Sequence, residues 1–362
     1  MRIGVITYDF YPYKGGQGRY LIELYNRIYK KEDFLVFSPN VNNLKNHITL
    51  FKVTQLFGKN LLYSLLLNFK IDDLIRKYGL DIVHLNCGPG GILLNKKPKA
   101  RLICTVYHTY YQQQKYISGQ KWKYLLYSLE KRMYGNADKL IAVSEDTRNV
   151  LIQNYGVDSS KIELIHCGVD LKRFKRDEKI QKFENSLLFV GRLDKRKGID
   201  FLIKALPLVK KEIPNVKLFV IGSKKMPKNL ENFIRKNGME QDIELLGFVQ
   251  ESLSEWYNHC QITTVPSVFE GLGIVALESM ACGTPVVASD VDGLRSIIEN
   301  NKNGILVEYN NKEELANQIV RLLKTPLLRK KFSKNGLKTV KEKFDMDRIA
   351  LKTVKMYENV VY

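Results

Sequence analysis

Short, continuously apolar runs alternate with amphipathic segments along almost the whole chain. Continuous apolar runs of this length are typical of strands buried on both faces of a parallel sheet. The first series of predicted strands covers Ile3–Thr7, Phe34–Phe37, Ile82–Leu85, Leu102–Val106, Lys139–Val143 and Ile162–Ile165. The second series covers Ser186–Val190, Lys217–Ile221, Ile243–Leu246, Ile262–Val265, Pro285–Ala288 and Gly304–Val307.

Between these runs, apolar residues recur at the spacing of one helix face. Helices are predicted at Gly18–Lys30, Ile71–Tyr78, Ser144–Asn154, Gly198–Lys211, Leu230–Asn237, Ser252–Asn258 and Lys312–Leu323. Alternating strands and helices predict an α/β fold with doubly wound parallel sheets. The two series meet at a polar, charged segment, residues 170–185, as expected of a domain boundary. We therefore expect two Rossmann-like domains, residues 1–170 and 171–345.

Composition fits an ordinary soluble globular protein and excludes several other classes. The 362 residues are 44% hydrophobic and 27% charged, and this length suffices for two domains. The N-terminal residues resemble a first strand rather than a signal peptide, and the longest apolar-rich stretch, Leu61–Phe69, is too short to cross a bilayer. The five cysteines have no paired or metal-binding spacing. We expect a cytoplasmic protein with reduced cysteines and no metal site.

The net charge of +20 raises the question of an anionic partner. Between Asn95 and Arg132, nine basic residues accompany one acid, Glu130, with tyrosines and a tryptophan interleaved. Two interpretations stay open: a solvated lysine-rich surface, or a region, Lys115–Arg132, that contacts an anionic membrane. Because both halves of the chain are equally basic, no segment reads as a nucleic-acid-binding tail, and we expect no nucleic-acid partner.

Two carboxylates, Glu270 and Glu278, flank a glycine-containing turn in the segment from Pro266 to Pro285. Glu270 follows a predicted strand, and Glu278 lies one turn into an apolar helix. Free N–H groups at the start of that helix favour an anion, while the carboxylates can accept hydrogen bonds from hydroxyl groups. The segment therefore predicts a ligand that is part phosphate and part polyol, such as a nucleotide-sugar.

Ligands of doubly wound sheets bind beyond the carboxyl ends of the strands, and further candidates follow other predicted strands. Arg192 and Lys197 come after the strand ending at Val190, just before a helix, where two cations can neutralise a diphosphate. Gly15, Gly16 and Gly18 follow the first strand and let the backbone approach a phosphate group. This loop is not a dinucleotide fingerprint, because its glycine spacing differs.

The N-terminal half offers one candidate catalytic histidine. It also offers three polar residues that are candidate contacts of an acceptor, meaning a second substrate that would receive the sugar of a nucleotide-sugar. His108 follows the strand Leu102–Val106, at the edge of the sheet where ligands bind. His84, Asn86 and Gln17 are weaker candidates for the acceptor, and a lone histidine in such a strand is as well explained by a structural role.

Taken in order, these motifs resemble the retaining glycosyltransferases of family 4. The resemblance spans nearly the whole chain and rests on Gly15–Arg19, Val143–Glu145, Gly168–Phe174, Val190–Gly198, Leu246–Val249 and the pair Glu270 and Glu278. It implies a GT-B fold, in which two facing Rossmann-like domains form an interdomain cleft. It also implies that a final helix, residues 346–362, returns to the N-terminal, acceptor-binding domain, while residues 171–345 bind the donor.

The resemblance implies a role for each candidate residue. Glu270 and the backbone of Gly271, Leu272, Gly273 and Ile274 would hold the donor sugar and its distal phosphate, and Glu278 the ribose hydroxyls. Arg192 and Lys197, helped by the Gly15–Gly16 loop, would bind the diphosphate. Gly222, Phe248 and Val249 would line the nucleotide pocket, and His108 would contact the donor sugar and orient the acceptor. Departures from the family are Thr109 in place of a common Asp, Cys167 in place of Asn and Leu272 in place of Phe.

We therefore expect transfer of a hexosyl group, with retention, from a nucleotide diphosphate sugar to a sugar or lipid-linked acceptor. A UDP-sugar is favoured over a GDP-sugar, and neither a cofactor nor a divalent metal is expected. Two alternatives stay open. One is a nucleotide-sugar epimerase on the same fold, and the other is a non-enzymatic basic protein that binds a membrane or nucleic acid.

Overall fold

A computed structural model of the chain describes residues 1–11, 16–29, 33–39, 44–51, 59–87, 93–116, 126–222, 225–249, 251–271 and 273–361, without the side chains of 59, 60, 115 and 116. The chain divides into two compact units. Unit 1 comprises Met1–Gly168 and Met346–Tyr362, and unit 2 comprises Val169–Asp345. Gly15 and Leu272, which the sequence places at the site, lie outside the described residues.

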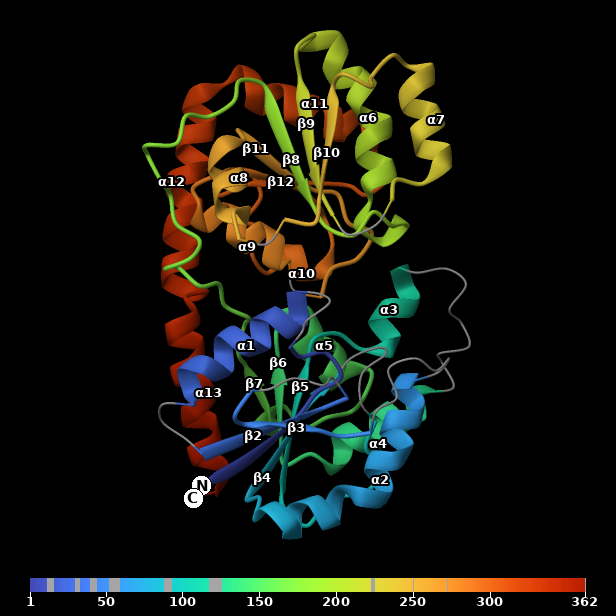
Figure 1. Cartoon of the computed structure of the whole chain (residues 1–362), viewed down its shortest axis with the longest axis vertical. Coiled ribbons are helices and arrows are strands. Elements are labelled where there is room, and N and C mark those ends of the chain that lie inside the picture. Colours follow the sequence, from blue (N-terminus) through green and yellow to red (C-terminus); the bar gives the residue numbers. More distant parts are fainter. Residues whose placement is uncertain are drawn as a thin grey trace. The chain divides into compact units, whose positions relative to one another are not determined.

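Unit 1 contains a seven-stranded parallel sheet in the order β3-β2-β1-β4-β5-β6-β7 (Figure 1). All six strands predicted for this half are confirmed to within two residues at each end. The short edge strand β3 was not predicted. The strands are β1 (Arg2–Ile6), β2 (Asp33–Ser38), β3 (His47–Thr49), β4 (Ile82–Cys87), β5 (Arg101–Val106), β6 (Lys139–Ala142) and β7 (Ile162–Leu164).

Helices surround this sheet, and one of them differs from its predicted bounds. The second helix begins twelve residues earlier than predicted, because its N-terminal half has apolar residues on several faces rather than on one stripe. The C-terminal helix packs against the first helix of the unit (Figure 1). The helices are α1 (Gly16–Ile28), α2 (Lys59–Tyr78), α3 (Tyr110–Tyr116), α4 (Tyr127–Asn136), α5 (Glu145–Gln153) and α13 (Met346–Val361), with a 3₁₀ turn at Ser159–Lys161.

Unit 2 contains a six-stranded parallel sheet in the order β10-β9-β8-β11-β12-β13. Its predicted strands are confirmed to within one residue at each end: β8 (Ser186–Val190), β9 (Lys217–Ile221), β10 (Ile243–Gly247), β11 (Ile262–Val265), β12 (Val286–Ser289) and β13 (Ile305–Val307). The helices are α6 (Ile199–Glu212), α7 (Lys228–Lys236), α8 (Leu253–His259), α9 (Ile274–Ala281), α10 (Asp292–Arg295), α11 (Lys312–Lys324) and α12 (Pro326–Lys343), with a 3₁₀ turn at Lys195–Lys197.

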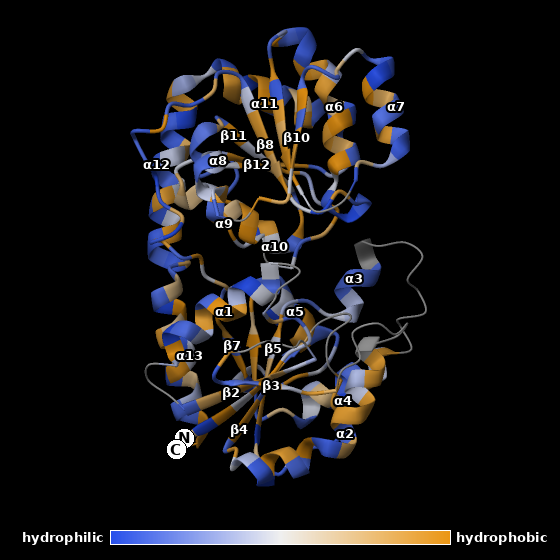
Figure 2. Ribbon diagram, viewed as in Figure 1, coloured by the Kyte–Doolittle hydropathy of each residue, from blue (hydrophilic) through white to orange (hydrophobic). Residues whose placement is uncertain are grey.

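Hydrophobic residues concentrate in the strands and on the sheet-facing sides of the helices of each unit (Figure 2). All five cysteines are buried and none forms a disulfide, which confirms their predicted place in the core. A search of the described helices finds none that combines the length and the apolarity needed to span a bilayer.

The two segments of chain that pass from one unit to the other lie side by side. The Val169 N–H donates to the Phe344 carbonyl oxygen at 2.8 Å. A Cβ on Gly168 would lie 2.8 Å from the Met346 Cα, so only glycine fits at this crossing.

Candidate functional site

In unit 2, Lys197 and Glu270 form an ion pair, although 73 residues separate them in the sequence. Lys197 ends the 3₁₀ turn after β8, and Glu270 lies in the loop after β11, which is the neighbouring parallel strand. The carboxyl ends of parallel neighbours meet at one edge of the sheet, so the topology brings the two side chains together. Only 17% of the lysine side chain and 9% of the glutamate side chain are exposed.

A close backbone approach holds these two loops against each other. Gly198 has a φ of +69°, and a Cβ at this position would lie 1.7 Å from the carbonyl oxygen of Pro266. The Val268 N–H donates to the Arg196 carbonyl oxygen at 2.9 Å across the same contact. Only glycine meets both demands, because other residues rarely adopt a positive φ and would also clash. Gly198 therefore sets where Lys197 lies relative to Glu270.

The surroundings of Glu270 keep it ionised. Burial by itself would raise the pKa of this carboxyl group, but the Lys197 ammonium, the nearby Arg196 and a 2.9 Å hydrogen bond from the Ser267 hydroxyl hold the pKa below its ordinary value. Burial lowers the pKa of Lys197, and the Glu270 carboxylate opposes that effect. Ser267 and Arg196 were not predicted from the sequence, because neither stands out from its neighbours in the linear pattern.

Helix α9 begins at Ile274, four positions after Glu270, and its N-cap residue supplies no side-chain cap. Its N-cap residue, Gly273, has a φ of +60° and makes no side-chain capping bond. The first N–H groups of a helix have no partner within the helix and carry partial positive charge. The start of α9 therefore offers donors to an anion beside the Lys197–Glu270 pair, as the sequence predicted for Gly271 to Ile274.

Glu278 lies in the middle of α9 and is buried. Its carboxylate accepts a 2.8 Å hydrogen bond from the Tyr257 hydroxyl of α8. Tyr257 is a further residue that the sequence analysis missed, since α8 precedes Glu278 by about twenty positions and only the packing of the two helices joins them.

The remaining donor candidates of unit 2 lie at the same edge of its sheet. Gly222 follows β9, and a Cβ there would lie 2.2 Å from the Gly191 carbonyl oxygen. Phe248 and Val249 follow β10, and Phe248 is 65% exposed. Arg192 follows β8 and forms a 3.1 Å ion pair with Asp194, with 48% of its side chain exposed. The arginine is therefore held near the strand end yet remains accessible.

In unit 1, His108 lies half-buried in the loop between β5 and α3, at the carboxyl end of its strand as predicted. The adjacent Thr109 is fully buried and caps α3 by a pair of reciprocal bonds. Its hydroxyl accepts from the Gln112 N–H at 3.1 Å, and its own N–H donates to the Gln112 side-chain oxygen at 2.9 Å. This capping box explains why threonine suits a position where the resembled family often has aspartate, since both residues cap helices.

The structure corrects the expectation for His84 and Asn86, which both lie in the core of unit 1. The His84 ring nitrogens meet the Tyr357 hydroxyl at 2.6 Å, the Tyr25 hydroxyl at 3.1 Å and the Thr105 hydroxyl at 2.8 Å. Burial lowers the pKa of His84 to about 3, so the ring is neutral. Asn86 accepts a 2.9 Å bond from the Tyr107 hydroxyl. Both residues face inward from a strand covered on both faces, so neither can contact an acceptor.

Gly16 and Gln17 form the first turn of α1, with Gly16 exposed and Gln17 half-buried. In the described part of the basic, aromatic region, some side chains lie in the core of unit 1. Tyr107 and Tyr110 are buried, and Glu130, its one acid, is 1% exposed.

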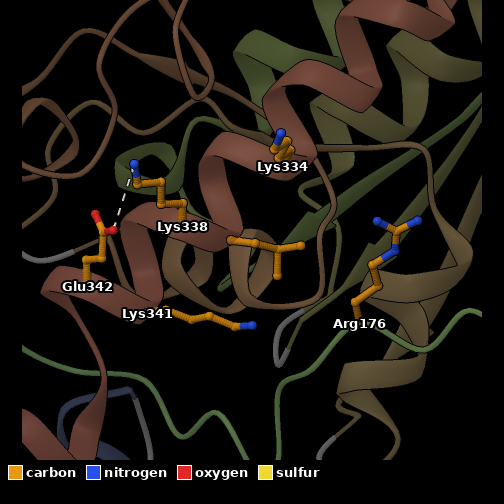
Figure 3. Close-up of a pocket in the computed structure, with 6 residues that line it drawn as sticks. Arg176, Lys334, Lys338, Lys341 and Glu342 are labelled. Carbon is orange, nitrogen blue, oxygen red and sulfur yellow. Dashed lines mark ion pairs between the residues drawn. The ribbon is translucent and has the colours of Figure 1, made fainter.

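One basic pocket lies away from all of these residues. It has a volume of about 370 Å³ and is lined by α12 and by Arg176. Its cations are Arg176, Lys334, Lys338 and Lys341, and Lys338 pairs with Glu342 at 3.9 Å (Figure 3). None of the predicted site residues contributes to it. Among the described residues, no three histidine, cysteine or acidic side chains gather as metal ligands would.

The comparisons with known proteins agree with this arrangement. Residues 170–339 match the family described as "Glycosyl transferases group 1", and residues 14–173 match "Glycosyltransferase Family 4". The structure is similar to that of the sucrose-phosphate synthase of Thermosynechococcus elongatus, with a TM-score of 0.85, 23% identity and 99% of each chain covered. It is also similar to Anabaena HepE in complex with UDP and glucose, with a TM-score of 0.78, 20% identity, and 99% of this chain and 100% of that chain covered.

Two parallel α/β units of this kind define the GT-B fold. The chain is also 32% identical to the uncharacterized glycosyltransferase MJ1178 of Methanocaldococcus jannaschii, over 97% of this chain and 96% of that protein. The chain belongs to the group 1 glycosyltransferases, also called family 4.

Other relatives match only in part. The D-inositol 3-phosphate glycosyltransferase of Streptomyces bingchenggensis is 30% identical over 63% of this chain and 54% of its own length. Several of the curated relatives are matched over only about half to three fifths of their length.

Proposed function

We propose that the chain is a retaining glycosyltransferase that transfers a hexosyl group from a UDP-sugar to the hydroxyl group of a sugar or lipid-linked acceptor. The observation that carries the proposal is the buried Lys197–Glu270 pair beside the uncapped start of α9. Burying two charges costs desolvation free energy that their attraction need not recover, so stability alone does not account for such a pair. Here it stands next to helix N–H groups at the edge of the sheet where ligands bind.

Each part of this arrangement suits one part of the donor. The Lys197 ammonium and the first N–H groups of α9 would bind the distal phosphate, and Arg192 would turn from Asp194 toward the diphosphate. Glu270 would accept hydrogen bonds from the sugar hydroxyls, and Glu278 from the ribose. The UDP preference is supported by HepE, whose structures contain UDP, UDP and glucose, or UDP-glucose.

In the proposed reaction, the bond between the anomeric carbon and the diphosphate oxygen breaks while the acceptor oxygen bonds to the same face of that carbon. The proton of the acceptor hydroxyl passes to the departing phosphate. Lys197, Arg192 and the helix N–H groups stabilise the negative charge that builds up on the diphosphate. His108 of unit 1 would contact the donor sugar and orient the acceptor, and fixed cations would make a divalent metal unnecessary.

Thermal shift with UDP, GDP and ADP, each with and without Mg²⁺, tests the donor part. We expect stabilisation by UDP that is selective and independent of Mg²⁺. Glu270→Ala should abolish transfer of sugar from the UDP-sugar. Wild-type rates in that variant, or stabilisation by none of the nucleotides, would refute the assignment. An epimerised nucleotide-sugar formed without acceptor would identify the alternative enzyme.

We also propose that unit 1 contacts an anionic membrane that carries a lipid-linked acceptor. Helix α2 supports this idea, because Leu61, Leu65 and Phe69 recur every four residues on one face and are 53%, 55% and 74% exposed. Apolar groups on one side of a helix, with lysines nearby, are typical of interfacial binding. Of the basic region Lys115–Arg132, Lys131 and Arg132 are exposed on α4, whereas residues 117–125 lie outside the described part.

Vesicle flotation tests the membrane contact. The protein should float with vesicles that contain an anionic phospholipid and float less with neutral ones. The double variant Leu65→Glu, Phe69→Glu should lose this binding. Leu327→Glu, a change at an 82% exposed leucine of unit 2, serves as the matched control and should bind normally. Unchanged flotation of the α2 variant would refute the contact.

A further inference from the structure

The loop that carries His108 leads into α3, a helix of only seven residues. A helix this short has little stability of its own, because nucleation is unfavourable and its few hydrogen bonds do not offset that free energy. The position of its first turn, and of the loop before it, must therefore come from contacts with the rest of unit 1.

Every N–H group at the start of α3 has a side-chain partner. Thr109 and Gln112 satisfy each other in the capping box described above. The Tyr111 N–H donates to the Tyr155 hydroxyl at 3.3 Å, and the Tyr110 N–H donates to the Glu130 carboxylate at 3.0 Å. Because all four donors are occupied, the first turn of α3 is held in place by side chains and has no free N–H group to bind an anion.

Glu130 is the central acceptor of the hydrogen bonds that hold this turn. It comes from α4, is 1% exposed, and accepts hydrogen bonds from three groups. One carboxylate oxygen accepts from the Tyr134 hydroxyl at 2.9 Å, and the other accepts from the Tyr110 N–H and from the Tyr155 hydroxyl. A single buried charge thus ties α4, the start of α3 and the segment after α5 together, immediately beyond His108.

We propose that Glu130 is a positioning residue for glycosyl transfer: its carboxylate fixes the first turn of α3 and thereby the loop that holds His108. This inference rests on the proposed function, because it assigns His108 to the donor sugar and the acceptor. The side chain itself is buried and touches neither substrate. Its effect on the reaction passes through the backbone of Tyr110.

The three hydrogen bonds to Glu130 depend on its negative charge, and that charge changes near neutral pH. Burial raises the pKa of Glu130 to about 7, although hydrogen bonds from Tyr155, the Tyr110 N–H and Tyr134 oppose the rise. Within the described part of the chain, the titratable groups that interact with its charge include the Tyr134 and Tyr155 hydroxyls and the buried Cys87 thiol of β4. A protonated carboxyl group must donate one hydrogen bond, yet all three of its partners donate to it. Below about pH 7, at least one of these bonds is therefore lost or reversed.

Hydrogen exchange provides a test that does not depend on activity. Amide exchange of residues 107–116, corrected for the intrinsic effect of pH, should be slower at pH 8 than at pH 6 in the wild-type protein. Glu130→Gln should exchange at least tenfold faster at pH 8 and show no such difference between the two pH values. The matched control is Glu163→Gln, a change at an exposed glutamate of β7 in the same unit, which should behave as wild type.

Activity measurements test whether the hydrogen bonds of Glu130 affect catalysis. The kcat for transfer should rise with pH around a midpoint near 7 in the wild-type protein. Glu130→Gln should lower kcat about tenfold, as expected for loss of one charge-assisted hydrogen bond, and should remove that midpoint. The thermal shift with UDP should stay unchanged, since the variant leaves the candidates of unit 2 intact and UDP lacks the sugar that His108 would contact. If Glu130→Gln does not fold, Tyr134→Phe replaces it. Loss of a bond that lowers the pKa should move the midpoint above 7.

The outcomes separate this proposal from the proposed function. Wild-type exchange at residues 107–116 in Glu130→Gln, or a pH midpoint that persists in that variant, overturns the role of Glu130. An equal loss in Glu163→Gln does the same. Absence of any transfer by the wild-type protein overturns the proposed function instead, and the exchange data still decide whether Glu130 holds the loop.

Discussion

Glu270→Gln tests whether the Lys197–Glu270 pair behaves as a buried charge pair. Glutamine has the shape of glutamate and keeps an oxygen that can accept the Ser267 hydrogen bond, so the change removes little beyond the charge. The Lys197 ammonium then stays largely buried, with 17% of the side chain exposed and no anionic partner across the contact. Because the pKa of Glu270 is held below its ordinary value, its carboxyl group is ionised at pH 7, where the comparison is made.

Loss of one partner of a buried pair costs about 3–5 kcal/mol. The partial exposure of Lys197 favours the lower end, and we expect Glu270→Gln to lower the free energy of unfolding of unit 2 by about 3 kcal/mol. Lys197→Met together with Glu270→Gln removes both charges and should cost only about 1 kcal/mol, because no unpaired charge remains. The double variant should thus be more stable than the single one.

Urea unfolding followed by tryptophan fluorescence measures this difference. The chain has two tryptophans, and Trp122→Phe leaves Trp256 of α8, which lies in unit 2 against Phe219 with 5.3 Å between ring centroids. With a urea slope of about 2 kcal/mol per molar, the midpoint should fall by about 1–1.5 M in Glu270→Gln. A loss below about 1 kcal/mol, or a double variant less stable than Glu270→Gln, would show that the pair is effectively solvated and refute the reasoning.

Two further predictions concern unit 2. Gly198→Ala should destabilise the unit by more than about 2 kcal/mol and remove the stabilisation by UDP, because the new Cβ would clash with the Pro266 carbonyl oxygen. The control is Gly238→Ala, at a glycine with a similar positive φ but open space around it. This control should keep UDP binding. Lys182 donates to the Asn258 and Cys260 carbonyl oxygens and the Thr284 hydroxyl, and burial lowers its pKa to about 8 from an ordinary value of 10.5. Between these values the unfolded chain binds more protons, so the unfolding free energy should rise from pH 8 to pH 10. Lys182→Met should flatten that rise, and an unchanged slope would contradict the assignment.

Most of the sheet architecture could be predicted from the sequence, because buried parallel strands are local, continuous apolar runs. Helices with one clear apolar stripe, such as α6 and α11, were also predictable. The pattern failed where that stripe is absent. The edge strand β3 has only three half-buried residues, and α12 carries so many lysines that its buried positions are hard to recognise.

The site divides in a similar way. Glu270, Lys197 and Arg192 follow predicted strands, and the rule that ligands bind at strand ends made them candidates. The structure places them after β8 and β11, and their roles stay predictions. His84 and Asn86 illustrate the limit of that rule. They belong to β4 itself, and whether a polar residue near a strand end faces solvent or the core depends on the helices that cover the sheet.

The sequence by itself determined the strands, the order of the motifs and the membership of a glycosyltransferase family. Each of these follows from residues that are close together in the chain, namely apolar runs and short motifs. Only the tertiary structure decided which side chains meet. Lys197 reaches Glu270 across two neighbouring strands, and Tyr257 reaches Glu278 across two helices. Glu130, one acid within a basic stretch, is a surface charge by sequence. It becomes the buried partner of the α3 start because three donors from separate elements converge on it.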